Sequence, residues 1–379
     1  MANTVSGFYQ TLVVAATSAS QTLVGTTSLL DSVYRDFKPV AVSPGQTLNI
    51  PIPASVTNQV ADIGVGDFNV QDVTANTKSL VFNQHPGYAY VVRDFEQFNT
   101  PENIRGVFLD AAIKGMAEYV NAQIAALLTP TNFNVYAVIN AITQGKLGVP
   151  DVTKAWGNLA TGKVPVRDLG NFFLTMHSTP YAAMLSDDKW TANSQVGYQL
   201  AGGIRRAAML GEQFGALSEY DQQMPANVAT VVTGTSVGVT NGSAAVTGVG
   251  TSFNTQLVPG GWLQFASDTT GTYYQILSIG SATALTLTAN YAGTTNAATS
   301  ASYTSFMNAL FHRNAIALGL RLLPDPDPRI VDYTTVYYKG IPINVQFGFN
   351  QLKRGWVVTL DAGYALGVIR PDHCQLIRS

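Results

Sequence analysis

The sequence has little charge, a single cysteine and no long apolar run, and each shortage excludes a class of protein. Charged residues make up 12% of the 379 residues, against roughly 25% in an average soluble domain. The net charge is −2, with no basic stripe of the kind that tight nucleic-acid binding requires. Because Cys374 is the only cysteine, no internal disulfide can form and folding does not depend on an oxidising compartment.

Membrane and secretion features are also missing. No basic residue precedes Arg35, so the start of the chain does not read as a signal peptide. No segment approaches the roughly 20 consecutive apolar residues of a membrane span. We therefore expect no membrane association, and we expect synthesis and folding in a cytoplasm.

The low charge has two explanations, which composition alone leaves open. Hydrophobic residues make up 46% of the chain, enough for a sizeable core in two or three domains. A surface with so few charges fits a protein whose exterior is largely subunit interface, where charged residues are depleted. It also fits a Thr-, Ser- and Gly-rich β protein that stays in solution through neutral polar groups.

Residues that could carry chemistry are few and scattered. The four histidines, none of which lies in a metal-binding motif, are His85, His177, His312 and His373. Residues 248–251 (GVGT) lack the lysine and the following helix of a phosphate loop. The adjacent pairs Asp187–Asp188 and Arg205–Arg206 are interpreted as exposed helix residues, and Asp325 and Asp327 as part of a rigid proline turn. The sequence therefore predicts no catalytic residue, no metal site, no cofactor and no enzymatic activity.

The predicted elements indicate a mixed α+β protein. Residues 1–30 carry no charge, and a short helix is expected at 28–37. Residues 40–95 are expected to be extended, with strands around 48–52, 80–82 and 88–92 and a long loop or hairpin tip at 61–78. A long helix is predicted at 101–128, capped by Thr100 and stopped by Pro130, since apolar residues recur there at three- and four-residue steps.

The second half continues the mixed pattern, except for one segment. Helices are expected at 152–159 and 180–185, with a strand at 171–176 between them. Residues 226–303 contain one charged residue, Asp268, and show short alternating runs separated by turn residues, which predicts a small all-β module inserted into the host domain. A further helix, predicted for residues 306–323, contains His312, and strands close the chain near Ile377.

Four segments, in this order, resemble the coat proteins of tailed bacteriophages with the Hong-Kong-97-type fold, particularly the short-tailed-phage branch. The strand at 88–98 leads into the long helix, as the family's extended loop leads into its spine helix. Residues 207–225 (AAMLGEQFG, then EYDQQMP), 308–317 (NALFHRNAIA) and 361–371 (DAGYALGVIRP) are similar to later family motifs. The resemblance spans most of 1–225 and 304–379.

The resemblance implies a domain organisation. Residues 1–40 would be an N-terminal arm, 41–95 an extended loop, and 96–225 with 304–379 a core of peripheral and axial domains. Residues 226–303 would be an inserted β-rich domain, similar to Thr/Gly-rich modules of other phage structural proteins through 246–253 (VTGVGTSF) and 285–288 (LTLT).

The resemblance also implies a function. The chain would be a major capsid protein that forms hexamers and pentamers in an icosahedral shell, assembled in the host cytoplasm and retained in the virion. Scaffolding, portal and decoration proteins would be separate partners, and packaged double-stranded DNA would lie against the inner face without sequence-specific contact. The alternative is a phage tail or decoration protein whose β-rich module binds a shell or a glycan.

Overall fold

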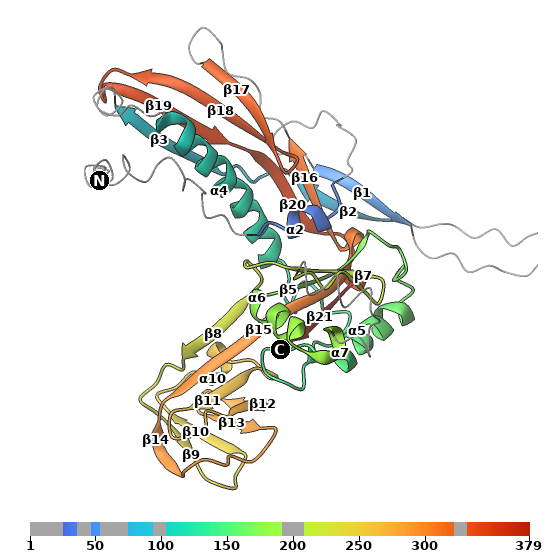
Figure 1. The fold of residues 1–379 in the computed structure, drawn as a ribbon, viewed down its shortest axis with the longest axis vertical. Coiled ribbons are helices and arrows are strands. Elements are labelled where there is room, and N and C mark those ends of the chain that lie inside the picture. Colours follow the sequence, from blue (N-terminus) through green and yellow to red (C-terminus); the bar gives the residue numbers. More distant parts are fainter. Residues whose placement is uncertain (1–25, 36–46, 54–74, 94–103, 192–207, 322–331) are drawn as a thin grey trace, which may run out of the picture. The chain divides into compact units, whose positions relative to one another are not determined.

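A computed structural model describes residues 26–35, 47–53, 75–93, 104–191, 208–321 and 332–379 (Figure 1). The chain divides into two compact units. Unit 1 comprises residues 1–22, 34–116 and 316–369, and unit 2 comprises 23–33, 117–315 and 370–379. Each unit is therefore assembled from segments far apart in the sequence.

Unit 1 contains a hairpin held against a second strand pair. Strands β1 (Thr47–Pro53) and β2 (Ala75–Val81) are antiparallel, as are β16 (Ile316–Arg321) and β20 (Gly363–Val368). Leu80 of β2 is buried in a small cluster with Ala317 and Ala365. Leu80 approaches so closely because Gly319 and Gly367 have no side chains, and a Cβ at Gly367 would lie 2.9 Å from it. The predicted strand around 48–52 is confirmed, whereas the loop or hairpin tip predicted at 61–78 is wrong from Ala75 onward, because β2 begins there and pairs with β1.

The larger sheet of unit 1 has the strand order β17-β18-β19-β3. Its strands are Asp332–Tyr338, Ile341–Asn350, Gly355–Asp361 and Gly87–Arg93, all antiparallel to their neighbours. Val345, Val358 and Leu360 are fully buried. Apolar residues at alternate positions thus give the sheet one buried face.

The long predicted helix is confirmed as α4 (Ile104–Ala126), while its predicted cap at Thr100 and Pro101 lies outside the described residues. Residues up to Met116 belong to unit 1 and the rest to unit 2. Figure 1 shows the first half of α4 running along the β3–β19 side of the sheet. Within unit 2, Ala117, Val120 and Ile124 are fully buried, at the three- and four-residue spacing on which the prediction rested.

The core of unit 2 is built around strand β15 (Ala301–His312). Its second half pairs with β5 (Phe172–Met176) on one side and β21 (Cys374–Arg378) on the other. Strand β5 continues the sheet to β7 (Ala216–Tyr220) and β6 (Glu212–Gln213), and β21 pairs with β4 (Ile139–Asn140). Helices α5 (Val149–Thr161), α6 (Ser178–Leu185) and α7 (Asp188–Thr191) complete this part. The strand predicted at 171–176 and both predicted helices are confirmed.

The segment 226–303 is all-β, as predicted, apart from a single helical turn, α10 (Phe253–Gln256). Its strands are β8 (Ala226–Val231), β9 (Ser236–Val239), β10 (Ala245–Val249), β11 (Trp262–Phe265), β12 (Tyr273–Ser281), β13 (Ala284–Leu287) and β14 (Asn296–Thr299). The first half of β15 pairs with β11 and β8, so one strand carries hydrogen bonds of both this segment and the core sheet. A separate apolar cluster within residues 232–303 fills the segment, and it shares no residue with the cluster around β5.

The helix predicted at 306–323 is wrong. Residues 301–312 form strand β15, a 3₁₀ turn follows at Arg313–Ala315, and β16 begins at Ile316. Nine consecutive residues from Thr304 to His312 include only one that is not buried, Met307. The sequence of a strand that is buried on both faces shows no alternation of apolar and polar residues. Its apolar run cannot be told from that of a buried helix by periodicity, which explains the error.

The short helix predicted at 28–37 is also shorter in the structure. Helix α2 spans Leu29–Ser32, and Val33 is extended with φ −96° and ψ 159°. Within unit 1, Tyr34 forms an isolated parallel bridge with Ala317. Residues 36 and 37 lie outside the described residues.

Candidate functional site

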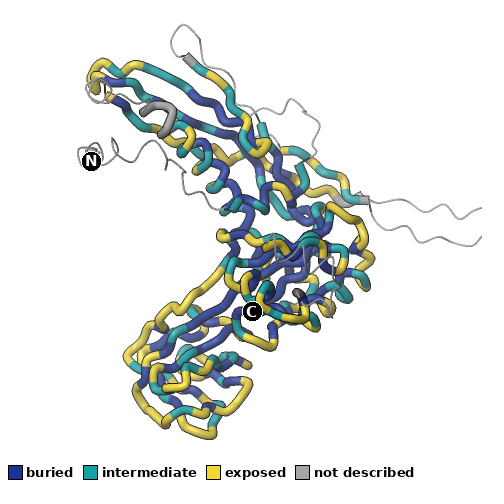
Figure 2. The backbone as a smooth tube through the Cα atoms, viewed as in Figure 1, coloured by how far each residue is buried: buried dark blue, intermediate teal, exposed yellow. Residues whose placement is uncertain are grey.

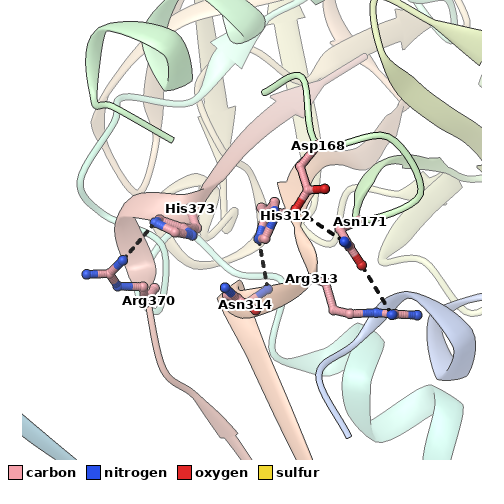
Figure 3. A network of polar contacts seen from close by, with 7 residues as sticks. All are labelled: Asp168, Asn171, His312, Arg313, Asn314, Arg370 and His373. Carbon is pink, nitrogen blue, oxygen red and sulfur yellow. Dashed lines mark hydrogen bonds and ion pairs between the residues drawn. The ribbon is translucent and has the colours of Figure 1, made fainter. Parts of the chain in front are cut away.

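One polar network of unit 2 surrounds two histidines that lie far apart in the sequence (Figure 3). His312 Nε2 lies 3.1 Å from Asp168 Oδ2, and the Asn314 N–H donates to His312 Nδ1 at 3.2 Å. Because Nδ1 accepts, Nε2 carries the proton and donates to Asp168. This hydrogen bond, followed by one from Asn171, holds the pKa of Asp168 below its ordinary value.

The network extends toward the start of the chain through Arg313. Its guanidinium donates to Asn171 Oδ1 at 3.2 Å and to the Asp31 carbonyl at 2.8 Å. It also lies 5.9 Å from the centre of the Phe173 ring. Arg313 thus ties α2 to the end of β15, because one planar group can donate in several directions.

His373 lies edge-on to His312, with 5.6 Å between the ring centres. Arg370 donates to His373 Nε2 at 3.2 Å, while Nδ1 is buried without a hydrogen-bond partner among the described residues. Burial lowers the pKa of His373 to about 4; the Asp372 carboxylate opposes this shift, and Arg370 and His312 add to it. His373 is therefore neutral at pH 7.

The antiparallel register of β15 and β21 pairs Phe311 with Cys374, which brings His312 and His373 together. The histidines are scattered in the sequence, and this pair was not predicted. The helix predicted around His312 is wrong as well, because His312 ends a strand. No local motif could have indicated the pair, because it depends on a strand pairing between residues that are 63 positions apart, Phe311 and Cys374.

This network does not form a nucleophilic site. Cys374, next to His373, is buried, and burial raises the pKa of its thiol far above its ordinary value. A reactive cysteine requires an accessible thiolate. Among the described residues, no group of three or more His, Cys, Asp or Glu side chains could hold a metal ion. The arrangement is a polar clamp that joins α2, β15 and the segment before β21.

The other residues singled out from the sequence are dispersed. Asp187 pairs with Lys146 at 2.8 Å and is only 13% exposed, so the expectation of a solvated side chain is wrong for Asp187, whereas Asp188 is exposed. His85 lies 3.3 Å from Asp361, and His177 caps α6. Residues 248–251 form the end of β10 and a turn. The remaining candidates, Arg205, Arg206, Asp325 and Asp327, lie outside the described residues.

A second polar cluster, which the sequence does not indicate, anchors α2. The Asp221 carboxylate is fully buried and accepts from the Asn121 amide at 2.8 Å, the Ser28 hydroxyl at 3.1 Å and the Gln223 N–H at 2.8 Å. Asn121 in turn accepts from the Leu30 N–H at 3.2 Å. These contacts fix the position of α2 in unit 2, because a buried carboxylate must keep its donors.

Unit 2 also exposes apolar surface. An apolar groove of about 630 Å³ is lined by Thr153, Trp156, Arg167, Leu169, Phe214 and Gly215. Leu169 is 63% exposed and Phe214 45% exposed. Phe214 also has φ +53°, a strained value for a bulky residue. Exposed aromatic and aliphatic side chains around a groove are typical of protein contact surfaces.

Strand β8 is a second surface of this type. All six of its residues are exposed, as Figure 2 shows, and none is charged. Within the described part of the chain it pairs with β15 alone, so its other edge is open. An uncharged open edge can accept a further strand.

Comparisons with known proteins identify the fold. No family model and no curated protein matches the chain. A solved structure from Mycobacterium phage Che8 is similar, with a TM-score of 0.53 and 13% identity over 93% of this chain and 90% of that one. The capsid structure of the cyanophage P-SCSP1u is similar with a TM-score of 0.53 and 11% identity, over 96% and 90%. The chain has a phage capsid fold.

In the described residues, no helix has the length and apolar character needed to cross a membrane. The groove around Phe214 and the open edge of β8 are exposed surfaces of the described part of the chain.

Proposed function

We propose that this chain is the major capsid protein of a tailed bacteriophage, a non-enzymatic subunit that assembles into the icosahedral head shell around the phage genome. The observation that carries the proposal is the capsid fold, which extends over more than nine-tenths of the chain. Low charge and exposed apolar surface support it, since charge is depleted at subunit interfaces.

At a finer level, we assign the chain to the Hong-Kong-97-type fold. Residues 1–40 act as an arm, 41–95 as an extended loop, α4 as the spine helix, and 226–303 as an inserted β-rich domain. The remainder, 96–225 and 304–379, forms the peripheral and axial domains. The β1–β2 hairpin supports the loop assignment, because its anchored base leaves residues 54–74 between two strands.

The partners follow from the same proposal. Copies of the chain form hexamers and pentamers, and scaffolding, portal and decoration proteins act as separate components. DNA contact is non-specific, in keeping with the net charge of −2. A tail or decoration protein is not favoured, because the similarity to capsid structures covers the helical part as well as the β-rich segment.

Electron microscopy of the purified chain tests the proposal. We expect closed shells, hexamers or pentamers by negative staining and light scattering, alone or with its scaffolding protein. A matched variant, Phe214→Ser, whose thermal unfolding is measured beside its assembly, separates assembly from folding, because Phe214 is 45% exposed but also packs edge-on against the buried Trp190. A chain that stays monomeric or trimeric under all conditions would contradict the proposal.

A further inference from the structure

The apolar groove of unit 2 contains one cation and no acid. Trp156, Leu169 and Phe214 supply its apolar surface, and Arg167 is the only charged residue that lines it. The Thr153 hydroxyl donates to a backbone carbonyl of its own helix at 2.9 Å, so it is already satisfied. The Arg167 side chain is exposed and forms no hydrogen bond or ion pair within the described part of the chain. The groove therefore presents a guanidinium that lacks an acceptor.

The backbone holds Phe214 at the groove in a strained conformation. Phe214 has φ +53°, in the left-handed region that a bulky residue rarely adopts. Gly215 follows with φ +79°, and a Cβ there would lie 3.1 Å from the Val166 carbonyl oxygen. One side of the Phe214 ring packs edge-on against the buried Trp190, yet the residue stays 45% exposed. Strained backbone of this kind is typical of binding sites, where the surrounding structure fixes it.

The groove suits a polypeptide segment better than a small molecule. A small-molecule pocket typically encloses about 70% or more of its ligand's surface. Leu169 is 63% exposed and Arg167 is exposed, so the lining covers only one side of an occupant. An extended segment can place apolar side chains on Trp156 and Phe214 and, at the same time, a carboxylate on Arg167. A segment with a lysine or arginine at that position would be repelled.

The described surface of a second copy does not supply such a segment. Among the exposed large apolar side chains that the structure describes, three stand directly beside an acidic residue: Tyr119, Leu169 and Tyr220. The acids beside them already have partners within the chain: Glu118, Asp168, Glu219 and Asp221. The described surface therefore offers no free carboxylate next to an exposed apolar side chain, and charge complementarity favours a different protein.

We propose that the groove binds a segment of a separate protein of the particle, in which large apolar side chains flank an aspartate or glutamate. The carboxylate pairs with Arg167, and the apolar side chains cover Trp156, Leu169 and Phe214. The planar guanidinium fixes the orientation of the segment, while apolar contact supplies most of the affinity. This inference rests on the proposed function for the existence of separate particle proteins, whereas binding itself belongs to the groove of the isolated chain.

A peptide library tests the chemistry of the occupant without requiring assembly. Short random peptides are selected on the purified full chain and counter-selected on Phe214→Ser. The selected peptides should share an aspartate or glutamate with aromatic or aliphatic residues on both sides. Peptides that share no acidic residue, or that carry a basic residue in its place, would overturn the proposal.

A double-mutant cycle assigns the carboxylate to Arg167. Replacing the acid of a selected peptide by its amide should weaken binding to the unchanged chain about tenfold or more, because a hydrogen-bonded charge pair is lost. The same replacement should have little effect on binding to Arg167→Gln. The matched control Lys353→Gln, which removes an exposed cation of unit 1, should keep the full difference. Equal losses on Arg167→Gln and on the unchanged chain would contradict the pairing.

Folding and self-association are measured on the same variants. Leu169→Ser and Phe214→Ser should lose the peptide, whereas Leu277→Ser, at a residue of β12 that is 59% exposed, should bind it normally. Because Phe214 packs on Trp190, its variant can lose stability; Leu169→Ser then carries the test, with unchanged thermal unfolding. If the unchanged chain binds no peptide and the groove variants lose self-association, a second copy occupies the groove and the proposal is wrong.

The outcomes separate this inference from the proposed function. A chain that forms shells but binds no peptide overturns this inference alone. A chain that binds the acidic peptide through Arg167 and never assembles overturns the proposed function, while the groove remains a peptide-binding site.

Discussion

At the residue scale, His373 is a buried titratable group that the folded protein keeps in its neutral form at pH 7. His373 is 5% exposed, and its charged neighbours are Arg370 and Asp372, with the His312 ring beside it. The neutral form is favoured because a proton would have to be buried beside a guanidinium. The clamp is therefore assembled at neutral pH and weakened by acid.

We predict that His373 makes folding acid-sensitive. The folded pKa is about 4, whereas an unfolded histidine has a pKa of about 6.5. As pH falls from 7 to 4.5 the unfolded chain takes up the proton and the folded chain does not, which costs about 2 to 3 kcal/mol of unfolding free energy. Below pH 4 both states are protonated, and this loss stops. Urea unfolding at pH 7 and pH 4.5 measures it.

The variant His373→Asn removes the titrating group, so its unfolding free energy should fall less between the two pH values. The control His85→Asn replaces a histidine whose side chain is 61% exposed and should keep the full difference. An equal fall in His373→Asn and the unchanged protein would contradict this assignment.

At the residue scale, neither the clamp nor the Asp221 anchor could be predicted from the sequence. Each joins residues that are brought together by strand pairing or by packing of α2, and neither has a local motif. Asp221 lies in the segment EYDQQMP, where nothing distinguishes a buried acceptor from an exposed acid. Its role as a buried acceptor is defined only by the donors around it, among them Ser28 and Gln223.

At the element scale, helices and strands with one apolar face could be predicted from the sequence, and a strand buried on both faces could not. Helix α4 has apolar residues at helical spacing, and β1 alternates, so both were predicted from sequence. Strand β15 is covered on both faces along its second half, so its apolar run carries no period. Its context in the sheet, between β5 and β21, decides its conformation.

The β3–β19 pairing depends on Gly355, which gives a prediction for an element. A Cβ at Gly355 would lie 2.6 Å from the Val92 carbonyl oxygen and 2.9 Å from Arg93 Cα. Both atoms belong to the β3 backbone, which cannot rotate away. We therefore expect Gly355→Ala to lower the unfolding free energy by about 1 to 3 kcal/mol and to speed amide exchange in β3.

Gly348→Ala is the matched control, since Gly348 lies on the adjacent strand β18 and a Cβ there would have no atom within 4 Å. Its unfolding free energy should stay unchanged or rise slightly, because alanine restricts the unfolded chain. Equal effects of the two substitutions would show that loss of glycine flexibility, and not the clash, sets the result.

At the scale of the whole molecule, the order of segments along the chain predicted the fold better than any single motif did. The mixed α+β class and the change of character at residue 226 followed from composition and periodicity. The way in which the β-rich segment joins the core could not be predicted from composition or periodicity. Strand β15 belongs to both, and the Met307 N–H donates to the Pro225 carbonyl at 2.8 Å, so the two ends of the segment are adjacent.

This adjacency predicts that residues 226–303 can be replaced by a short Gly/Ser bridge from Pro225 to Thr304. The pairs of β15 from Met307 onward remain, and the apolar cluster around β5 contains no residue of the deleted segment. The core should therefore unfold cooperatively and keep its circular dichroism in the far ultraviolet. Its melting temperature should fall, because the Gln275 amide that donates to Ala141 and the Pro259 carbonyl that accepts from Arg378 are lost.

The segment expressed alone completes the test. All residues of its apolar cluster lie within 232–303, so a fragment covering 226–306 should fold without the core and show its own unfolding transition. Arg378 is only 5% exposed and loses its acceptor in the deleted chain. Adding Arg378→Met to that chain should recover part of the lost melting temperature, because an unpaired buried charge costs more than an apolar side chain. An insoluble core and an unfolded fragment together would mean that the two parts fold only as one cooperative unit joined through β15.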